Sequence, residues 1–397
     1  MSTENAAAPA IDPPRPMPWL LIAATCLATF AITASGSTRA PFLIDMAGDL
    51  DVSLTMIANL FGMTSIAWGL TSFGAGVFSD KIGRRPFLVG SPIALAGALG
   101  GVAQAESFVA VATWATLAGG CCGMFTGVSM AEIASRVTDR QRGRALGWIM
   151  AGQSMTLLVG VPLASWIGAS IGWRGVHLCI AVLALLSAVT MYATTSTVPK
   201  PGTFKGGAKS PSLASALTGS VIRLLGSVFA ERICFGLASI YYATFMLQTY
   251  GLSLRTLAIP LVIFAAGNIL GTIVGGQLGD RLRDRRMTFA IALMIAGTAA
   301  VLLFGWQSSV VISTVMGFVF MFTNAICRPS LMAALAEVPA EVRGTVMGMN
   351  STAASAGWLA AAAVGGWILS AVGFAGFGPF SAILALLGAG LAILGRR

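Results

Sequence analysis

Long apolar runs repeat along the whole chain, and they constrain its fold more than any other feature. Hydrophobic residues make up 56% of the 397 residues and charged residues only 10%, whereas soluble proteins carry about 25% charged residues. Each run is close to the ~20 residues that a helix needs to cross about 30 Å of hydrocarbon. We count twelve such runs, at 19–41, 55–75, 86–104, 108–131, 145–167, 175–195, 224–248, 257–277, 287–305, 309–333, 346–370 and 376–395. The sequence therefore predicts an all-α membrane protein with twelve transmembrane helices.

The net charge of +10 does not indicate a nucleic-acid partner, because the basic residues follow a membrane pattern. If the N-terminus lies in the cytoplasm, 19 of the 24 Lys and Arg residues fall in cytoplasmic segments, and two, Arg174 and Arg255, fall in external loops. The other three, Arg39, Arg232 and Arg328, lie inside apolar runs. Since cytoplasmic loops carry an excess of Lys and Arg, we expect both termini in the cytoplasm and the chain in a bacterial inner membrane.

The loop between the second and third runs, GVFSDKIGRRPFLVG, combines glycines, an acid and several basic residues. Gly76 lets backbones approach closely, and Gly83 allows the tight turn that reverses the chain. Asp80 can accept hydrogen bonds from a neighbouring helix N-terminus, whose free amides favour an anion. Arg84 and Arg85 can each bind a carboxylate or extend to the lipid surface. The alternative interpretation is an ordinary basic loop on the cytoplasmic side.

This loop resembles the signature of the major facilitator superfamily, G-x-x-x-D-[RK]-x-G-[RK]-[RK], between helices 2 and 3. Every main position is matched, by Gly76, Asp80, Lys81, Gly83, Arg84 and Arg85. In that family an acidic residue at the inner end of helix 4 often pairs with an Arg of this loop. The resemblance therefore implies a gating motif in which Glu132 pairs with Arg84. The alternative for Glu132 is a solvated carboxylate at a helix end.

A second, degenerate copy of the motif, GQLGDRLRDRR, begins at Gly276. At an offset of 200 residues, Gly276, Asp280, Arg281 and Arg285 correspond to Gly76, Asp80, Lys81 and Arg85. Further downstream, RGRALG from Arg142 resembles RGTVMG from Arg343, at an offset of 201. The family resemblance implies two pseudo-symmetric bundles of six helices, related as parallel repeats.

The chain divides at residues 196–221, a segment rich in Pro, Gly, Ser and Lys that has the composition of a linker. We expect a disordered cytoplasmic tail over 1–17, an N-terminal six-helix bundle over 18–197, a cytoplasmic linker over 198–220 and a C-terminal six-helix bundle over 221–397. No cleavable signal peptide is expected, because the tail is acidic and the first apolar run is too long.

The fifth run contains Gly152, Gly160 and Pro162. Exporters of the superfamily often carry G-x-x-x-G-P-x-x-G-G here, and this chain keeps a Gly and a Pro, separated by Val161, without the trailing Gly pair. Pro162 removes a backbone hydrogen bond and is expected to kink the helix. The variant resembles the G-V-P-L-G-T form of bacterial sugar and drug efflux members, which favours export. A purely structural kink would say nothing about direction.

Charged residues deep inside apolar runs are functional-site hypotheses, because their burial in a membrane is costly. Glu231 and Arg232 lie in the seventh run, and Asn324 and Arg328 lie in the tenth. The resemblance implies that helices 1, 4, 7 and 10 line the cavity, so Glu231 and Arg328 are predicted to lie at comparable depth and to pair. Together with Arg39, these residues are the candidates for coupling and substrate binding. A structural salt bridge between helices 7 and 10 is the alternative.

The resemblance implies a secondary active transporter that works by alternating access. The sequence contains neither a Walker A motif nor a catalytic constellation, so ATP hydrolysis and enzyme activity are not expected. Sparse polar residues among Met, Phe and Trp favour an amphipathic or lipophilic solute. Proton-coupled efflux is the leading hypothesis. Proton-coupled uptake of a small organic anion is the alternative, because three Arg residues outnumber Glu231 within the runs. A polytopic enzyme or a non-transporting sensor is a third hypothesis.

The remaining polar residues are given structural roles. Asp45, Asp49 and Asp51 are expected to form a solvated external loop, and His177 is expected to pack at the external interface. The six cysteines lie in apolar runs without metal-ligand spacing. We therefore expect no metal and no cofactor. The expected partners are a small-molecule substrate, protons and the lipid bilayer, and the protein is expected to be a monomer.

Overall fold

The computed structural model describes residues 17–195, 217–282, 284–335 and 337–394. The predicted tail over 1–17 and the predicted linker over 198–220 lie almost entirely outside these residues. Helices make up nearly all of the described chain, which contains no strand. The prediction of an all-α protein is therefore confirmed.

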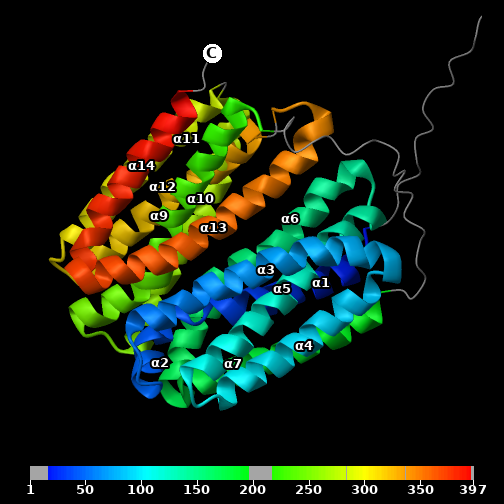
Figure 1. The fold of residues 1–397 in the computed structure, drawn as a ribbon, viewed down its shortest axis with the longest axis horizontal. Coiled ribbons are helices and arrows are strands. Elements are labelled where there is room, and N and C mark those ends of the chain that lie inside the picture. Colours follow the sequence, from blue (N-terminus) through cyan, green and yellow to red (C-terminus); the bar gives the residue numbers. More distant parts are fainter. Residues whose placement is uncertain (1–16, 196–216, 283, 336, 395–397) are drawn as a thin grey trace, which may run out of the picture.

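The predicted runs all fall largely within helices, which Figure 1 labels in chain order. The first half comprises α1 (Trp19–Ser37), η1 (Ala40–Phe42), α2 (Leu43–Asp49), α3 (Leu54–Ile82), α4 (Arg85–Gln104), α5 (Phe108–Arg136), α6 (Asp139–Met155), η2 (Thr156–Gly160) and α7 (Val161–Thr194). The second half comprises α9 (Gly219–Tyr250), α10 (Leu254–Arg281), α11 (Arg285–Gly305), α12 (Val310–Leu335), α13 (Ala340–Val372), η3 (Phe374–Gly376) and α14 (Phe377–Ile393). The fifth run crosses α6, η2 and the start of α7.

Ten helical segments of the described chain are long and apolar enough to cross a membrane. One of them, Arg144–Thr194, contains 51 residues, about twice the length that one crossing needs. Gly172 interrupts α7 within this segment with a φ of 69°, a backbone conformation that favours glycine. α9, which carries Glu231 and Arg232, is not among the ten. The chain is thus a helical protein with many membrane-spanning segments.

The region after α1 differs from the prediction of a solvated loop. Residues Leu43–Asp49 form the short helix α2, whose Leu43 and Met46 are buried while Asp45 and Asp49 are exposed. Leu43 and Met46 are three residues apart, so they share one helical face and pack into the core. Only the acidic face of the predicted loop is therefore solvated.

The helices pack in the same pattern in both halves. In the first half α3 packs along α5 and α4 along α7, and in the second half α10 packs along α12 and α11 along α14. Figure 1 shows the two bundles beside each other, the first coloured from blue through cyan to green and the second from green through yellow to red. They meet along two seams, where α3 contacts α13 and α7 contacts α10.

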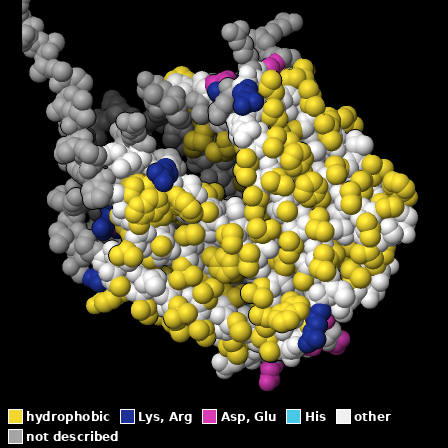
Figure 2. All heavy atoms as spheres, turned by 180° about the vertical axis from the view of Figure 1, so that it is seen from behind, with side chains coloured by type: hydrophobic (Ala, Val, Ile, Leu, Met, Phe, Trp, Pro, Cys, Tyr) yellow, Lys and Arg dark blue, Asp and Glu magenta, His cyan; other side chains and the backbone are white. Residues whose placement is uncertain are grey.

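Among the described residues, three hydrogen bonds join the halves across these seams. The Thr55 hydroxyl donates to the carbonyl oxygen of Gly366 at 3.0 Å. The Ser165 hydroxyl donates to the carbonyl oxygen of Leu254 at 2.7 Å, and Arg255 Nη2 donates to Ser170 Oγ at 2.9 Å. All three lie away from the end where Arg84 precedes α4 and Arg285 begins α11, here called the basic end. Figure 2 shows a hollow between the two lobes toward the basic end.

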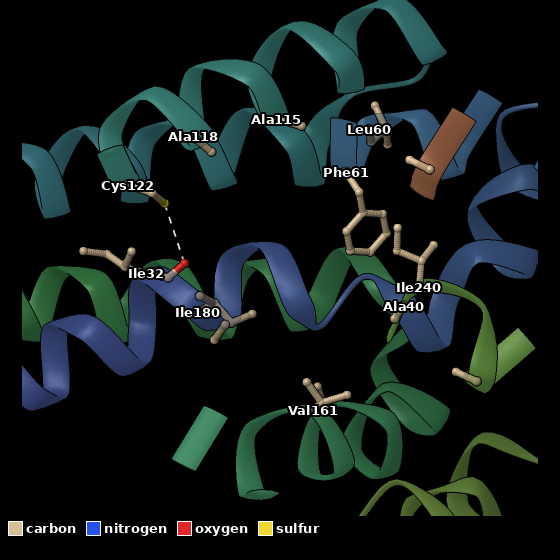
Figure 3. Packing of buried hydrophobic residues seen from close by; sticks show 14 of the residues in the cluster. Ile32, Ala40, Leu60, Phe61, Ala115, Ala118, Cys122, Val161, Ile180 and Ile240 are labelled. Atoms are coloured by element: carbon tan, nitrogen blue, oxygen red, sulfur yellow. Dashed lines mark hydrogen bonds between the residues drawn. The ribbon is translucent and has the colours of Figure 1, made fainter. Parts of the chain in front are cut away.

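One continuous hydrophobic core fills the first half and continues into the second. Figure 3 shows part of it, with Cys122 of α5 directed at α1 and Ile240 of α9 next to Ala40. The Cys122 thiol donates to the carbonyl oxygen of Ile32 at 3.6 Å. This thiol is fully buried, as expected of a small packing residue.

Candidate functional site

The predicted pair between α9 and α12 is present. Arg328 Nε donates to Glu231 Oε1 at 3.2 Å. Arg232 Nε lies 3.5 Å from the other carboxylate oxygen of Glu231. The side chain of Glu231 is only 2% exposed, whereas those of Arg328 and Arg232 are 22% and 23% exposed. The carboxylate is therefore enclosed by two guanidinium groups, and the cluster is open on the arginine side.

An aromatic pair completes this cluster. The Arg328 guanidinium lies 3.8 Å from the centre of the Phe235 ring, and that of Arg232 lies 5.9 Å from it. Trp358 of α13 meets Phe235 edge to face, with ring centres 5.5 Å apart. Aromatic faces stabilise cations in partly desolvated sites. The cluster therefore combines one acid, two bases and two aromatic rings.

Close contact between α13 and α9 positions these rings. A Cβ atom at Gly357 would lie 2.5 Å from the Cβ atom of Arg232, and one at Gly236 would lie 2.6 Å from the Cβ atom of Ala361. Small residues four apart allow such close helix packing in membranes. Sequence reasoning missed Phe235, Trp358 and Gly357. The spacing of Gly357, Ala361 and Gly365 was the signal that could have found this seam.

Several polar atoms beside the pair lack a hydrogen-bond partner. Arg328 Nη2 has none, and neither do the oxygen and nitrogen of the Asn324 amide, which is fully buried. Asn324 lies one turn before Arg328 on α12. Buried polar groups of proteins are normally paired, so this region can accept a ligand that offers both donors and acceptors.

Arg39 is not part of this cluster. It follows α1 in the first half, where it is 2% exposed. Its Nε donates to the carbonyl oxygen of Ser35 at 3.3 Å, and its guanidinium lies 5.6 Å from the centre of the Phe61 ring. The contacts of Arg39 therefore lie within the first half.

The loop between α3 and α4 forms the predicted turn and ion pair. Gly83 ends α3 with a φ of 92°. Arg84 Nη1 donates to the Ala131 carbonyl at 3.0 Å and lies 3.4 Å from Glu132 Oε2. Arg136 Nε donates to the other oxygen of Glu132 at 2.6 Å. The prediction that Arg84 pairs with Glu132 is confirmed.

The other positions of the motif differ in their contacts and exposure. Arg85 Nη2 donates to the Tyr192 carbonyl at 3.1 Å, and Lys81 is exposed. Gly276 has open space where a Cβ atom would lie, so no other described part of the chain packs closely against its backbone there. Gly76, Asp80 and Asp280 are not among the residues whose side chains are described, so their expected roles stay predictions.

The second copy of the motif repeats the first with a shift of one residue. Arg285 Nη1 donates to the Ala333 carbonyl at 3.4 Å and to Glu337 Oε1 at 3.1 Å. Arg84 makes the same two kinds of contact, so Arg285 takes the place of Arg84 and not, as predicted, that of Arg85. The offset of 200 fails here because side-chain contacts depend on the turn that precedes each helix. Glu337, the counterpart of Glu132, was missed.

Comparisons with known proteins agree with this architecture. The family described as Major Facilitator Superfamily matches residues 25–362 and 224–397. The chain belongs to the major facilitator superfamily. It is accordingly a multi-pass membrane transporter of small molecules and not an enzyme.

Relatives within the superfamily carry different names. The transcription regulatory protein OpdE of Pseudomonas aeruginosa is 26% identical over 308 residues, which cover 74% of each chain. The chloramphenicol resistance protein of Streptomyces lividans is 26% identical over 298 residues, or 72% of each. The inner membrane transport protein YdhP of Escherichia coli K12 is 28% identical over 275 residues, or 68% of each.

A solved structure has the same fold. It is a bacterial homologue of the human lysosomal transporter Spinster, in an inward-facing and occupied conformation. The TM-score is 0.76 at 15% sequence identity, over 96% of this chain and 97% of the other. The major facilitator fold is therefore confirmed.

The fifth span of this superfamily member is irregular where the sequence predicted a kink. η2 (Thr156–Gly160) is a π turn directly before α7, and Pro162 lies in the first turn of α7. The Thr156 hydroxyl donates to the Phe30 carbonyl of α1 at 3.1 Å. A Cβ atom at Gly160 would lie 3.1 Å from the Phe30 ring, and one at Gly152 would overlap the backbone of α1. These two glycines therefore hold the span against α1.

His177 lies in the interior and not at an interface. It is 1% exposed, and its Nδ1 hydrogen bonds to the Trp173 carbonyl at 2.7 Å. Beside it, Arg174 pairs with Asp49 at 2.6 Å. The described residues contain no group of three or more His, Cys, Asp or Glu that could hold a metal ion.

Proposed function

We propose that this transporter is a proton-coupled exporter of a small amphipathic or lipophilic solute. The observation that carries the proposal is the enclosed carboxylate of Glu231, held between Arg328 and Arg232. Burial favours the protonated form of a carboxyl group, whereas adjacent Arg residues favour the ionised form. A change in access to the cluster can therefore shift the balance between the two forms. Proton–solute antiport requires such a group.

The lining of the cluster supports an amphipathic solute. Phe235 and Trp358 offer apolar contact, while Arg328 Nη2 and the Asn324 amide offer polar contact. Ligand sites commonly combine an apolar wall with a few polar groups. The resemblance of the fifth span to efflux members, and the similarity to a chloramphenicol resistance protein, support export.

The proposal includes the membrane arrangement. The chain would be a monomer in a bacterial inner membrane. It would cross this membrane twelve times, because the 51-residue segment Arg144–Thr194 is long enough for two crossings and α9 completes the second bundle. Both termini would lie in the cytoplasm, since the loops at the basic end carry most of the Lys and Arg residues. The two bundles would rock about the central cluster to alternate access.

Uptake of a small organic anion is the second candidate. It is favoured by the charge of the cluster, where two Arg residues face one Glu. A carboxylate ligand would pair with the free Arg328 Nη2.

Transport in everted membrane vesicles separates the two candidates. An imposed pH gradient, acid inside, should drive accumulation of a fluorescent amphipathic dye if the protein exports such solutes. An aromatic carboxylate should instead leave preloaded everted vesicles if the protein takes up anions. Vesicles without the protein serve as the control. Failure of the pH gradient to move either probe would contradict proton coupling.

A further inference from the structure

A buried polar pair lies in the first half, near the C-terminal end of α1. Arg39 follows α1 and is 2% exposed, and His177 of α7 is 1% exposed. The Arg39 side chain turns back along α1, since its Nε donates to the Ser35 carbonyl at 3.3 Å and its Nη2 would lie 3.8 Å from a Cβ atom at Gly36. α1 packs along α7, and Arg39 and His177 are close enough to interact electrostatically.

The chain that follows Arg39 is fixed against α7 at two points. Phe42 of η1 lies on α7, where a Cβ atom at Gly168 would overlap its ring. Asp49 at the end of α2 accepts a hydrogen bond of 2.9 Å from Trp173 Nε1 of α7. These two contacts keep the guanidinium of the pair beside the imidazole.

Two nitrogen atoms of the pair are unsatisfied. Neither Arg39 Nη1 nor His177 Nε2 has a hydrogen-bond partner among the described residues. Arg39 also has no acidic partner among them, because the Asp49 carboxylate pairs with Arg174 instead. Arginine remains charged in proteins, and a buried charge without a compensating charge is costly. The pair therefore requires a negative charge that no described side chain supplies.

Uncharged groups form the surrounding wall. The Arg39 guanidinium lies 5.6 Å from the centre of the Phe61 ring. The Cys122 thiol donates its hydrogen to the Ile32 carbonyl at 3.6 Å. Figure 3 shows this hydrogen bond, and it shows the Phe61 ring directed at the chain near Ala40. The wall thus leaves room for a small ligand only.

The hydrogen bond of His177 determines what its second nitrogen can do. A carbonyl oxygen only accepts, so His177 Nδ1 carries a hydrogen and donates it to the Trp173 carbonyl at 2.7 Å. In the neutral ring Nε2 then holds a lone pair, which repels an anion. When the ring gains a proton, Nε2 becomes a donor and the ring becomes positive. An anion beside Nε2 is therefore bound together with a proton.

We propose that Arg39 and His177 bind one small monovalent anion, such as chloride, together with one proton. Arg39 Nη1 and the protonated His177 Nε2 donate hydrogen bonds to the anion. A water molecule at this point would satisfy both nitrogens but would leave the Arg39 charge uncompensated. The site is separate from the Glu231 cluster, and it does not depend on which solute is carried.

The imidazole is the group at this site that can take up the proton near neutral pH. Besides the Arg39 guanidinium, the contacts of α7 here lead to Asp49 and Arg174, which neutralise each other. α4 also packs on α7, and its one titratable residue, Arg85, lies at the basic end. From α5, the thiol described above uses its hydrogen for a backbone carbonyl.

Chloride binding to the purified full-length protein tests the proposal. Chloride replaces gluconate at constant ionic strength in detergent, and the rise in melting temperature along the titration gives the apparent dissociation constant. Wild type should bind chloride at least about tenfold more tightly near pH 6 than near pH 8, because one linked proton changes affinity by up to about tenfold per pH unit. Equal affinities at the two pH values would overturn the proposal.

Three variants identify the residues involved. Arg39→Met should lose the response to chloride, yet in gluconate it should melt no lower than wild type, because the uncompensated charge is removed. His177→Asn keeps a donor for the Trp173 carbonyl and removes the only histidine of the chain. It should bind chloride about tenfold more weakly near pH 6 and without pH dependence. Arg144→Met removes an exposed cation from α6 and should respond as wild type does. A wild-type response in Arg39→Met would overturn the proposal.

Bromide in crystals of the wild-type protein gives a measurement that needs no variant. An anomalous peak within hydrogen-bonding distance of both Arg39 Nη1 and His177 Nε2 is expected. Bromide peaks at other positions only, or a water molecule between these two atoms in the bromide crystal, would contradict the proposal.

Discussion

The Thr55 hydroxyl of one half donates to the Gly366 carbonyl of the other half at 3.0 Å. The two helices can meet there because Gly366 has no side chain, and a Cβ atom on it would overlap Thr55. Ser165 forms the second link of this kind, to the Leu254 carbonyl. Both links close the molecule at the end away from Arg84 and Arg285.

Removal of these links should favour opening at that end. Each neutral hydrogen bond contributes about 0.5–1.5 kcal/mol, so Thr55→Val and Ser165→Ala should each shift the conformational equilibrium about two- to twelvefold. Distances between spin labels on the two halves would report the shift. Thr113→Val is the control, because the Thr113 hydroxyl bonds only to its own helix. An unchanged distance distribution in both variants would show that the links do not hold this state.

Glu231→Gln should abolish transport driven by a pH gradient. The substitution keeps the size and hydrogen-bonding capacity of the side chain but removes its titration. Solute exchange without a gradient should remain measurable in the same vesicles. Glu106→Gln provides a matched control at an exposed position. If Glu231→Gln still accumulates solute in response to the gradient, the carboxylate is a structural clamp between α9 and α12.

Arg328→Met should destabilise the protein more than the double variant Glu231→Gln/Arg328→Met. The single change leaves a buried carboxylate with only Arg232 beside it, at a cost of about 3 kcal/mol. The double change removes the buried charge as well. Melting temperatures in one detergent would rank the variants. Arg174→Met, which breaks an exposed pair with Asp49, should cost less than about 1 kcal/mol. Equal melting temperatures for single and double variants would contradict a buried charge pair.

Gly83→Ala and Gly90→Ala should have opposite effects on stability. Both positions have open space around a Cβ atom, but Gly83 has a φ of 92° whereas Gly90 lies within α4. Alanine at position 83 should therefore cost about 1–3 kcal/mol in backbone strain. Alanine at position 90 should stabilise the helix by about 0.5–1 kcal/mol. Thermal unfolding distinguishes the two, and equal shifts would exclude backbone strain as the cause.

Loss of the acidic group in the gating motif should impair transport. Asp80→Asn keeps the side-chain volume but removes an anion expected beside the start of α13, a contact that contributes about 0.3–2 kcal/mol. We expect a severe loss of transport with normal amounts of protein in the membrane. Ser79→Ala at the neighbouring position tests whether any substitution there is harmful. A wild-type rate in Asp80→Asn would remove this residue from the gating mechanism.

The sequence predicted the features that follow from the length of the apolar runs and from the positions of the charged residues. Apolar runs of about 20 residues located the helices, and two isolated charges at comparable depth predicted the contact between Glu231 and Arg328. It did not predict how Phe235 and Trp358 meet, because the rotation of α9 against α13 is set by close approach at Gly357. The shift that gives Arg285 the contacts of Arg84 was also missed. That shift arises in the turn before each helix, where one residue changes which side chain reaches α5 or α12.

The π turn η2 adds about one extra residue to the fifth span. A π turn holds about one residue more than an α turn, and it lies between Gly152, which faces α1, and Ser165, which bonds to α10. Removal of one residue between Thr156 and Gly160 would let the π turn become an α turn. Gly152 would then still face α1, and Ser165 would still bond to α10. The same deletion in the regular part of α12 would rotate everything beyond it by about 100° and separate Arg328 from Glu231. A change in chain length is therefore tolerable at this turn, whereas in α12 it breaks the charge cluster.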